Sequence, residues 1–197
     1  MTARQSLRDA TRALHDRVET AVDLPARANT MDGYRGLLRA MLGLFAPIED
    51  RLAALPWARA GLDLDAHRRA PLLRADLRQF AGDADPARPC TDLPAPATLA
   101  AGFGCLYVLE GSALGGQIIA REAAASLGLG PETTRFFRSD GREVGRTWRA
   151  FGAALDGYVT TPERLDEATA AASQTFEAFE RCVARPVSAS LSSPTPS

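Results

Sequence analysis

The chain has 197 residues, 46% of them hydrophobic, which suits a single globular domain. Its net charge of -1 provides no basic field that would favour nucleic acid or an anionic membrane surface, so neither is expected as a partner. All 23 cationic residues are arginine, so an isolated arginine is weak evidence for a binding site.

Three cysteines, Cys90, Cys105 and Cys182, form no Cys-x-x-Cys pair. An odd number without metal-binding spacing predicts reduced thiols in a cytoplasmic protein, with Cys105 packed in the core. The charged N-terminus lacks the apolar segment of a signal peptide. No uninterrupted apolar stretch of about 18 residues is present, so we expect a soluble protein.

Helical periodicity dominates the first half of the chain. Residues 2–22 place apolar side chains at steps of three and four, which predicts an amphipathic helix. A second long helix is predicted over 32–55, broken or bent near Pro47, and a shorter one over 68–80. Residues 82–98 are rich in proline and are expected to form a surface connection.

The second half is also helical in pattern. A glycine-rich helix is predicted over about 99–127, stopped by Gly130 and Pro131, and further helices over 141–158 and 162–184. No strand is predicted. We therefore expect an all-α, multi-helix domain of six to eight helices over residues 1–185, followed by a disordered Ser/Pro-rich tail over 186–197.

Only two histidines, His15 and His67, are available for chemistry. A di-iron carboxylate bundle needs Glu-x-x-His motifs on two helices, and none occurs here. His67 stands among charged residues at a predicted helix start and is expected to lie on the surface.

One face of the first helix carries Arg8, Arg12, His15 and Glu19 at spacings of 4, 3 and 4. A carboxylate one turn beyond a histidine can accept its Nδ1 proton, so that Nε2 faces a metal. The two guanidiniums, one and two turns on the other side of the histidine, could hold carboxylates of the same ligand. Haem combines a metal with carboxylates in this way, although a plain solvated helix face would show the same pattern.

Gly111, Gly115 and Gly116 interrupt the apolar run of the glycine-rich helix, where each costs about 1 kcal/mol of helix propensity relative to alanine. They permit either close packing of two helices or contact between bare backbone and a flat ligand. Missing side chains also allow a helix to kink and so open a pocket.

Together, "LRDATRALHDRVE" and "YVLEGSALGGQ" resemble the proximal-helix and distal-helix motifs of haem oxygenases. The resemblance is strongest to bacterial biliverdin-producing members, some of which supply bacteriophytochrome chromophore. "FFRSDGREVGRTWRAF" resembles the segment after the distal helix in that branch, and "TFEAFE" is similar to the closing helix of the family. The likeness covers about residues 5–180.

The resemblance implies haem as both cofactor and substrate, held between a proximal and a kinked distal helix. It makes His15 the iron ligand, with Glu19 as its carboxylate partner. Arg8, Arg12 and Arg149 match basic residues near the haem propionates, with Arg146 as a rival to Arg149. Gly111, Gly115 and Gly116 match the distal glycines that touch the haem face.

Ser112 departs from the pattern, because many haem oxygenases have an aspartate there that organises water for proton delivery. Arg142, Asp140 or ordered water are the alternatives. The implied reaction opens haem to biliverdin, CO and iron with O2 and electrons from a ferredoxin or reductase type of donor. A bacteriophytochrome is a possible acceptor of the product.

Two rival functions stay open from the sequence. A haem carrier would keep His15 and the pocket without turning haem over, and a helical interaction module would bind no haem. A biliverdin spectrum after mixing with haem and a reductant distinguishes the enzyme from both.

Overall fold

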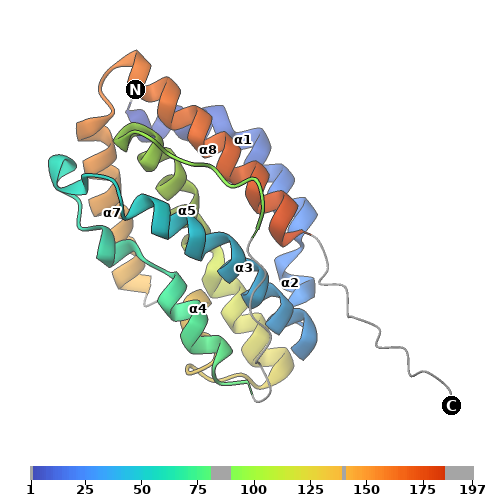
Figure 1. Cartoon of the computed structure of the whole chain (residues 1–197). Coiled ribbons are helices and arrows are strands. Elements are labelled where there is room, and N and C mark those ends of the chain that lie inside the picture. Colours follow the sequence, from blue (N-terminus) through green and yellow to red (C-terminus); the bar gives the residue numbers. More distant parts are fainter. Residues whose placement is uncertain (1, 81–89, 139–140, 185–197) are drawn as a thin grey trace, which may run out of the picture.

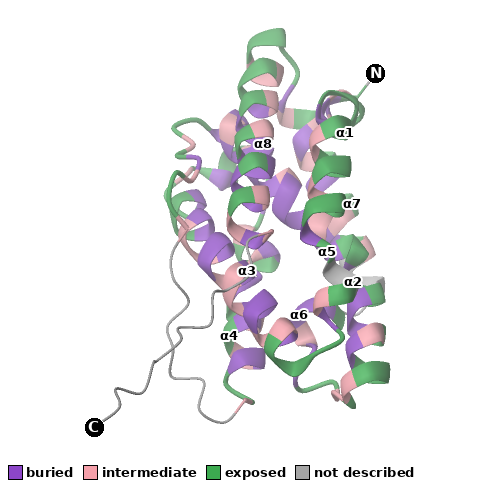
Figure 2. Ribbon diagram, turned by 90° about the vertical axis from the view of Figure 1, so that its right-hand side faces the viewer, coloured by how far each residue is buried: buried purple, intermediate pink, exposed green. Residues whose placement is uncertain are grey.

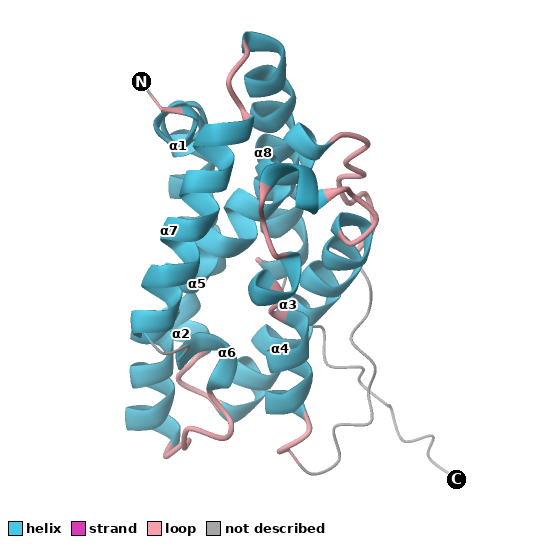
Figure 3. Cartoon of the chain, turned by 90° about the vertical axis from the view of Figure 1, so that its left-hand side faces the viewer, coloured by secondary structure: helices cyan, strands magenta, loops and turns pink. Residues whose placement is uncertain are grey.

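The computed structural model describes residues 2–80, 90–138 and 141–184, with the side chains at 24–25 and 141–144 outside that description. Within these ranges every regular element is a helix (Figure 3). The prediction of an all-α protein is therefore confirmed. Asp140 and the tail over 186–197 lie outside the described residues, as does the side chain of Arg142.

The predicted helices all form, close to their expected ends, and four short elements join them that periodicity did not reveal. The elements in chain order are α1 (Ala3–Val22), α2 (Leu24–Arg27), α3 (Met31–Leu52), the 3-10 helices η1 (Trp57–Ala60) and η2 (Leu64–His67), α4 (Ala70–Leu77), α5 (Leu99–Leu127), α6 (Arg135–Arg138), α7 (Gly141–Tyr158) and α8 (Pro162–Val183).

Threonine caps begin four of the long helices. Thr2, Thr30, Thr98 and Thr161 each accept a hydrogen bond from the backbone N–H three residues later. α5 ends at Leu127 and is capped by Gly128, whose φ of 65° is left-handed; this cap lies two residues before the expected stop at Gly130. Pro47 lies within α3 without ending it, so it does not break this helix. α5 is assigned as one continuous helix, and the kink expected of the distal helix stays a prediction.

α5 is the central helix, in contact with α3, α6, α7 and most extensively α8, while α1 lies along α8 (Figure 1). The close approach of α5 and α8 requires Gly104, because a Cβ there would overlap the carbonyl oxygen of Ala168. Buried residues face inward from the long helices (Figure 2). They include the fully buried rings of Tyr34, Phe45 and Phe151.

By length and composition alone, α5 could cross a membrane, but 61% of its most apolar window is buried inside the protein. The neighbouring helices that bury it are α8, α6, α7 and α3. We therefore assign α5 to the core of the protein.

The cysteines differ in part from the expectation of three reduced thiols. Cys90 and Cys182 form a disulfide with Cα atoms 5.8 Å apart, which joins the segment before α5 to the end of α8. The two cysteines are 92 residues apart, so no local sequence pattern could predict that they pair. Cys105 is free and buried, as predicted, and burial raises the pKa of its thiol to about 11.

Candidate functional site

A cavity of about 890 Å³ lies between α1 and α5, closed by side chains of α3, α6, α7 and α8. Most of the side chains selected from the sequence line it: Arg8, Arg12, His15, Glu19, Gly111, Ser112 and Gly115. Apolar and aromatic residues complete the wall, among them Met41, Tyr107, Leu114, Ile118, Trp148, Phe176 and Phe179. This combination of an apolar wall with a few polar groups is typical of a ligand pocket.

His15 contributes from the cavity side of α1, and its side chain is 54% exposed. The ring contacts Phe176 of α8 edge-on, with centroids 6.0 Å apart. Its Nε2 lies 3.7 Å from Glu19 and its Nδ1 lies 3.6 Å from Asp16. The structure thus reverses the expected pairing, since Nε2 rather than Nδ1 lies beside Glu19, and it adds Asp16 as a second carboxylate.

The basic end of the cavity is formed by Arg12 and Arg8, which lie about one and two turns before His15 on α1. Tyr107 of α5 lies in the same wall and contacts Trp148 of α7, with ring centroids 5.9 Å apart. Burial raises the pKa of the Tyr107 phenol, while a hydrogen bond with Thr11 and the charge of Arg8 lower it. This end therefore offers guanidinium groups beside a neutral hydroxyl.

The three distal glycines do not share one role. A Cβ added to Gly111 or Gly115 would meet nothing within 4 Å, so both leave open space on the cavity side of α5. Gly116 is buried instead against α6, where an added Cβ would lie 2.7 Å from the carbonyl oxygen of Phe137. Helical geometry alone could have predicted this difference, because Gly116 is rotated by about 140° from Gly111 around the helix axis and so faces another direction.

Ser112 lines the cavity, but its hydroxyl already donates to the carbonyl of Leu109, at 2.7 Å. A serine in this arrangement is bonded back to its own helix and has no carboxylate to relay protons.

Arg149 does not line the cavity and is exposed on α7. Its neighbour Trp148 lines the cavity instead. Trp148 belongs to the same "WRAF" motif, but it was not selected from the sequence. The aromatic positions Tyr107, Phe176 and Phe179 were also missed, since apolar residues at helical spacing look alike whether they face a core or a cavity.

His67 corrects a prediction, because it is 3% exposed rather than a surface residue. Its Nδ1 lies 3.2 Å from a carboxylate oxygen of Glu110, which is 1% exposed and directly precedes Gly111. Arg69 lies 3.7 Å from the same oxygen. A cluster of ionisable groups is thus buried behind the distal helix, where such groups are found mostly when paired.

The residues of the cavity fit haem. Gly111 and Gly115 leave bare helix backbone where a Cβ would otherwise fill the cavity, a histidine projects from the facing helix, and two arginines lie beyond it. A volume of about 890 Å³ falls in the upper range of ligand pockets.

A model of the family described as "Heme oxygenase" matches residues 1–185. The chain belongs to the haem oxygenase family. It is 34% identical over 154 residues to a haem oxygenase of Xanthomonas campestris pv. campestris (strain 8004), covering 78% of this chain and 90% of the relative. The chain is accordingly a biliverdin-producing haem oxygenase, with haem as its cofactor and substrate.

Solved haem oxygenases share the fold at lower identity. The NO- and CO-bound enzyme of Neisseria meningitidis is 23% identical with a TM-score of 0.77, covering 93% of this chain and 90% of that one. The haem complex of haem oxygenase-1 from the cyanobacterium Synechocystis sp. PCC6803 is 14% identical with a TM-score of 0.74, covering 93% and 91%. The overall fold is therefore that of solved haem oxygenases.

Proposed function

We propose that this haem oxygenase binds and opens haem in the cavity between α1 and α5. The observation that carries the proposal is the meeting of His15 from one helix with Gly111 and Gly115 from the other across a single cavity. The motifs that contain them are about 95 residues apart in sequence, and only the fold brings them together.

His15 would hold the iron. It is the one histidine in the described lining of the cavity, since His67 is buried behind α5. A carboxylate that accepts the imidazole N–H fixes which nitrogen is free to ligate. Glu19 and Asp16 both lie within 4 Å of the ring, so either can take that role.

Arg8 and Arg12 would hold the propionates, through charge-assisted hydrogen bonds that fix the rotation of the macrocycle in its plane. Bound haem supplies the iron at which O2 is activated for cleavage of its own ring. The bare backbone at Gly111 and Gly115 gives that reaction room on the distal side.

Proton delivery would depend on water rather than on Ser112 alone. The serine hydroxyl is bonded to the carbonyl of Leu109, so it can accept a hydrogen bond from water but cannot replace a carboxylate. We therefore give Ser112 a water-holding role.

The reaction requires electrons, and we propose a ferredoxin or reductase type of donor. We also propose a cytoplasmic location and a supply of biliverdin to a bacteriophytochrome. The motifs support this assignment through their resemblance to the bacterial branch of the family.

Turnover of haem in air with a reductant, followed by absorbance and product chromatography, tests the assignment. The native chain should yield biliverdin. His15→Ala should retain some haem with a shifted Soret band, lose turnover, and recover part of the native spectrum with added imidazole. Thr20→Ala is the matched control, because Thr20 is exposed on α1 and lies outside the cavity.

A haem carrier would bind haem with a native spectrum and give no biliverdin under these conditions. Unchanged ligation and turnover in His15→Ala would refute the role of His15. Equal losses in Thr20→Ala would show that the defect lies in α1 as a whole rather than in the ligand.

A further inference from the structure

A second cleft, of about 1320 Å³, lies on the other side of α5 from the haem cavity. On α5 the cleft is lined by Gln117, Ala120, Arg121 and Ala124, whereas the haem cavity takes residues such as Gly111, Gly115 and Ile118. At 3.6 residues per turn, the two sets point in directions roughly 150° apart. The helix therefore separates two independent spaces.

The lining of this cleft is unusually basic. Among the sixteen described residues that line it, five are arginine and one, Asp65, is acidic, whereas the whole chain has 23 arginines in 197 residues. The arginines are Arg68, Arg69, Arg121, Arg135 and Arg138. They come from the segment before α4, from α5 and from α6, so the fold rather than a local run of sequence gathers them.

Three of these arginines are held by acids that do not line the cleft. Each guanidinium lies within 4 Å of a carboxylate: Arg68 at 3.3 Å from Asp50, Arg69 at 3.7 Å from Glu110, and Arg135 at 3.6 Å from Asp76. Such pairing fixes the direction of each side chain, which reduces the entropy lost when a ligand binds.

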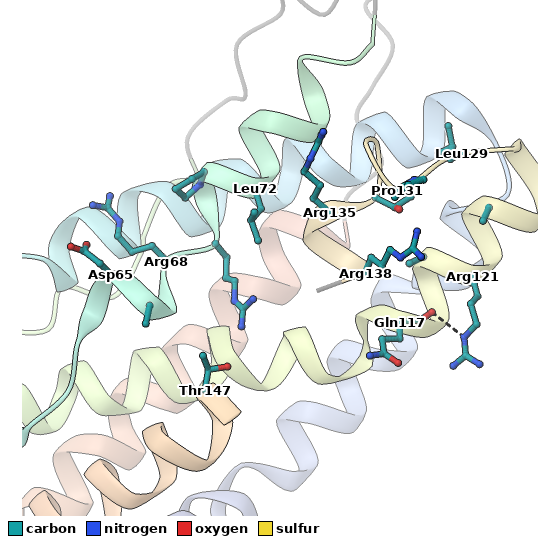
Figure 4. A pocket seen from close by; sticks show the side chains of 16 residues that line it. Asp65, Arg68, Leu72, Gln117, Arg121, Leu129, Pro131, Arg135, Arg138 and Thr147 are labelled. Atoms are coloured by element: carbon teal, nitrogen blue, oxygen red, sulfur yellow. Dashed lines mark hydrogen bonds between the residues drawn. The ribbon is translucent and has the colours of Figure 1, made fainter. Parts of the chain in front are cut away.

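Arg121 and Arg138 carry the charge that is left for a ligand. Within the part of the chain that the structure describes, neither has an ion pair with a carboxylate. The Nε of Arg121 donates to the carbonyl of Gln117 one turn earlier, at 3.2 Å, which leaves its terminal nitrogens available. Figure 4 shows Gln117, Arg121 and Arg138 at one end of the cleft, with Asp65 and Arg68 at the other.

The rest of the lining is mixed. Leu72, Leu129, Pro131 and two alanines of α5 give it apolar surface, and Thr134 and Thr147 add hydroxyl groups. A ligand would therefore contact carbon along its body and place acid groups at the guanidiniums. The concave shape suits a small molecule better than a flat protein surface.

We propose that this cleft binds a small polyanion, with two or more phosphate or carboxylate groups on a compact skeleton, and that Arg121 and Arg138 with the Gln117 amide hold its anionic end. Planar guanidinium groups bind both phosphate and carboxylate through paired hydrogen bonds. The site is separate from haem turnover, so its failure would leave the proposed function untouched.

Isothermal titration of the full chain with pyrophosphate and with citrate, at constant ionic strength, tests the proposal and distinguishes the two acid chemistries. At least one probe should bind at a single site with a Kd below about 1 mM. Arg121→Gln and Arg138→Gln should each weaken that binding tenfold or more. Arg74→Gln is the matched control, because Arg74 is exposed on α4 outside the cleft lining and should change the Kd less than twofold.

Absence of saturation by both probes would overturn the proposal. An equal loss of binding in Arg74→Gln would overturn it too, since it would indicate general charge attraction. The Soret band of haem-loaded protein, recorded in the same titration, should stay unchanged. Displacement of haem by the probe would instead place the anion at Arg8 and Arg12 and refute a second site.

Discussion

Adding one methyl group should stabilise the haem-free protein at Gly115 but not at Gly116. The two positions are adjacent on α5, so the intrinsic gain in helix propensity from glycine to alanine is the same, about 1 kcal/mol. At Gly115 the new Cβ meets nothing within 4 Å, and this gain should be kept. Gly115→Ala should therefore raise the free energy of unfolding by most of that amount.

At Gly116 the new Cβ would lie 2.7, 3.1 and 3.3 Å from the carbonyl oxygen, Cα and carbonyl carbon of Phe137. All three are backbone atoms, which a rotamer change cannot move aside. Overpacking of this kind costs about 1–3 kcal/mol, which cancels or exceeds the gain in propensity. The two variants should then differ by about 1–3 kcal/mol, or several degrees in Tm for a chain of this length.

Urea unfolding of both haem-free variants measures this difference, and a Soret titration measures haem binding. Gly115→Ala should bind haem more weakly in spite of its higher stability, because the methyl group enters the cavity. Gly116→Ala should be the less stable protein. If Gly116→Ala were as stable as Gly115→Ala while Gly115→Ala bound haem normally, the division of roles between the two glycines would be refuted.

Three further perturbations test other parts of the structure. Arg12→Glu should weaken haem binding in a Soret titration and give mixed biliverdin isomers on chromatography; native affinity with an unchanged isomer ratio would contradict the propionate role. Cys90→Ser should lower the free energy of unfolding by about 2–4 kcal/mol, and a reductant should cause the same fall in the native chain but none in the variant. Burial raises the pKa of Asp76 above its ordinary value of 3.8, so the folded protein holds that proton more tightly than the unfolded chain. The native chain should therefore lose stability relative to Asp76→Asn as pH rises through the folded pKa, and a relative gain over that range would refute the sign.

The sequence predicted the long helices because their signals are local. Apolar residues at steps of three and four mark α1. The threonines that cap α3, α5 and α8 are a further local signal, which the periodicity does not include. The four-residue helices α2 and α6 show less than two turns of any period, so no pattern could reveal them. The disulfide between Cys90 and Cys182 depends on two distant segments meeting, which spacing does not encode.

The candidate site was predictable to the extent that its residues are adjacent in sequence. His15 with Arg8 and Arg12, and Gly111 with Gly115, each lie on one helix face, so geometry within a single helix assigns them together. The prediction that His67 is exposed was wrong because burial depends on the tertiary structure. Charged neighbours predict exposure, and only the position of Glu110 on the inner side of α5 shows why this histidine is buried.

The glycines of α5 show how one helix serves two purposes with the same residue type. Gly104 and Gly116 allow backbone atoms of α8 and α6 to approach α5, while Gly111 and Gly115 leave space that no neighbour fills. Close packing alone would explain the first pair but not the second, since open space gains nothing from losing a side chain. The low helix propensity at Gly111 and Gly115 is therefore uncompensated in the haem-free protein. We propose that haem binding offsets it, which would give these two glycines a functional explanation and leave the packing explanation for Gly104 and Gly116.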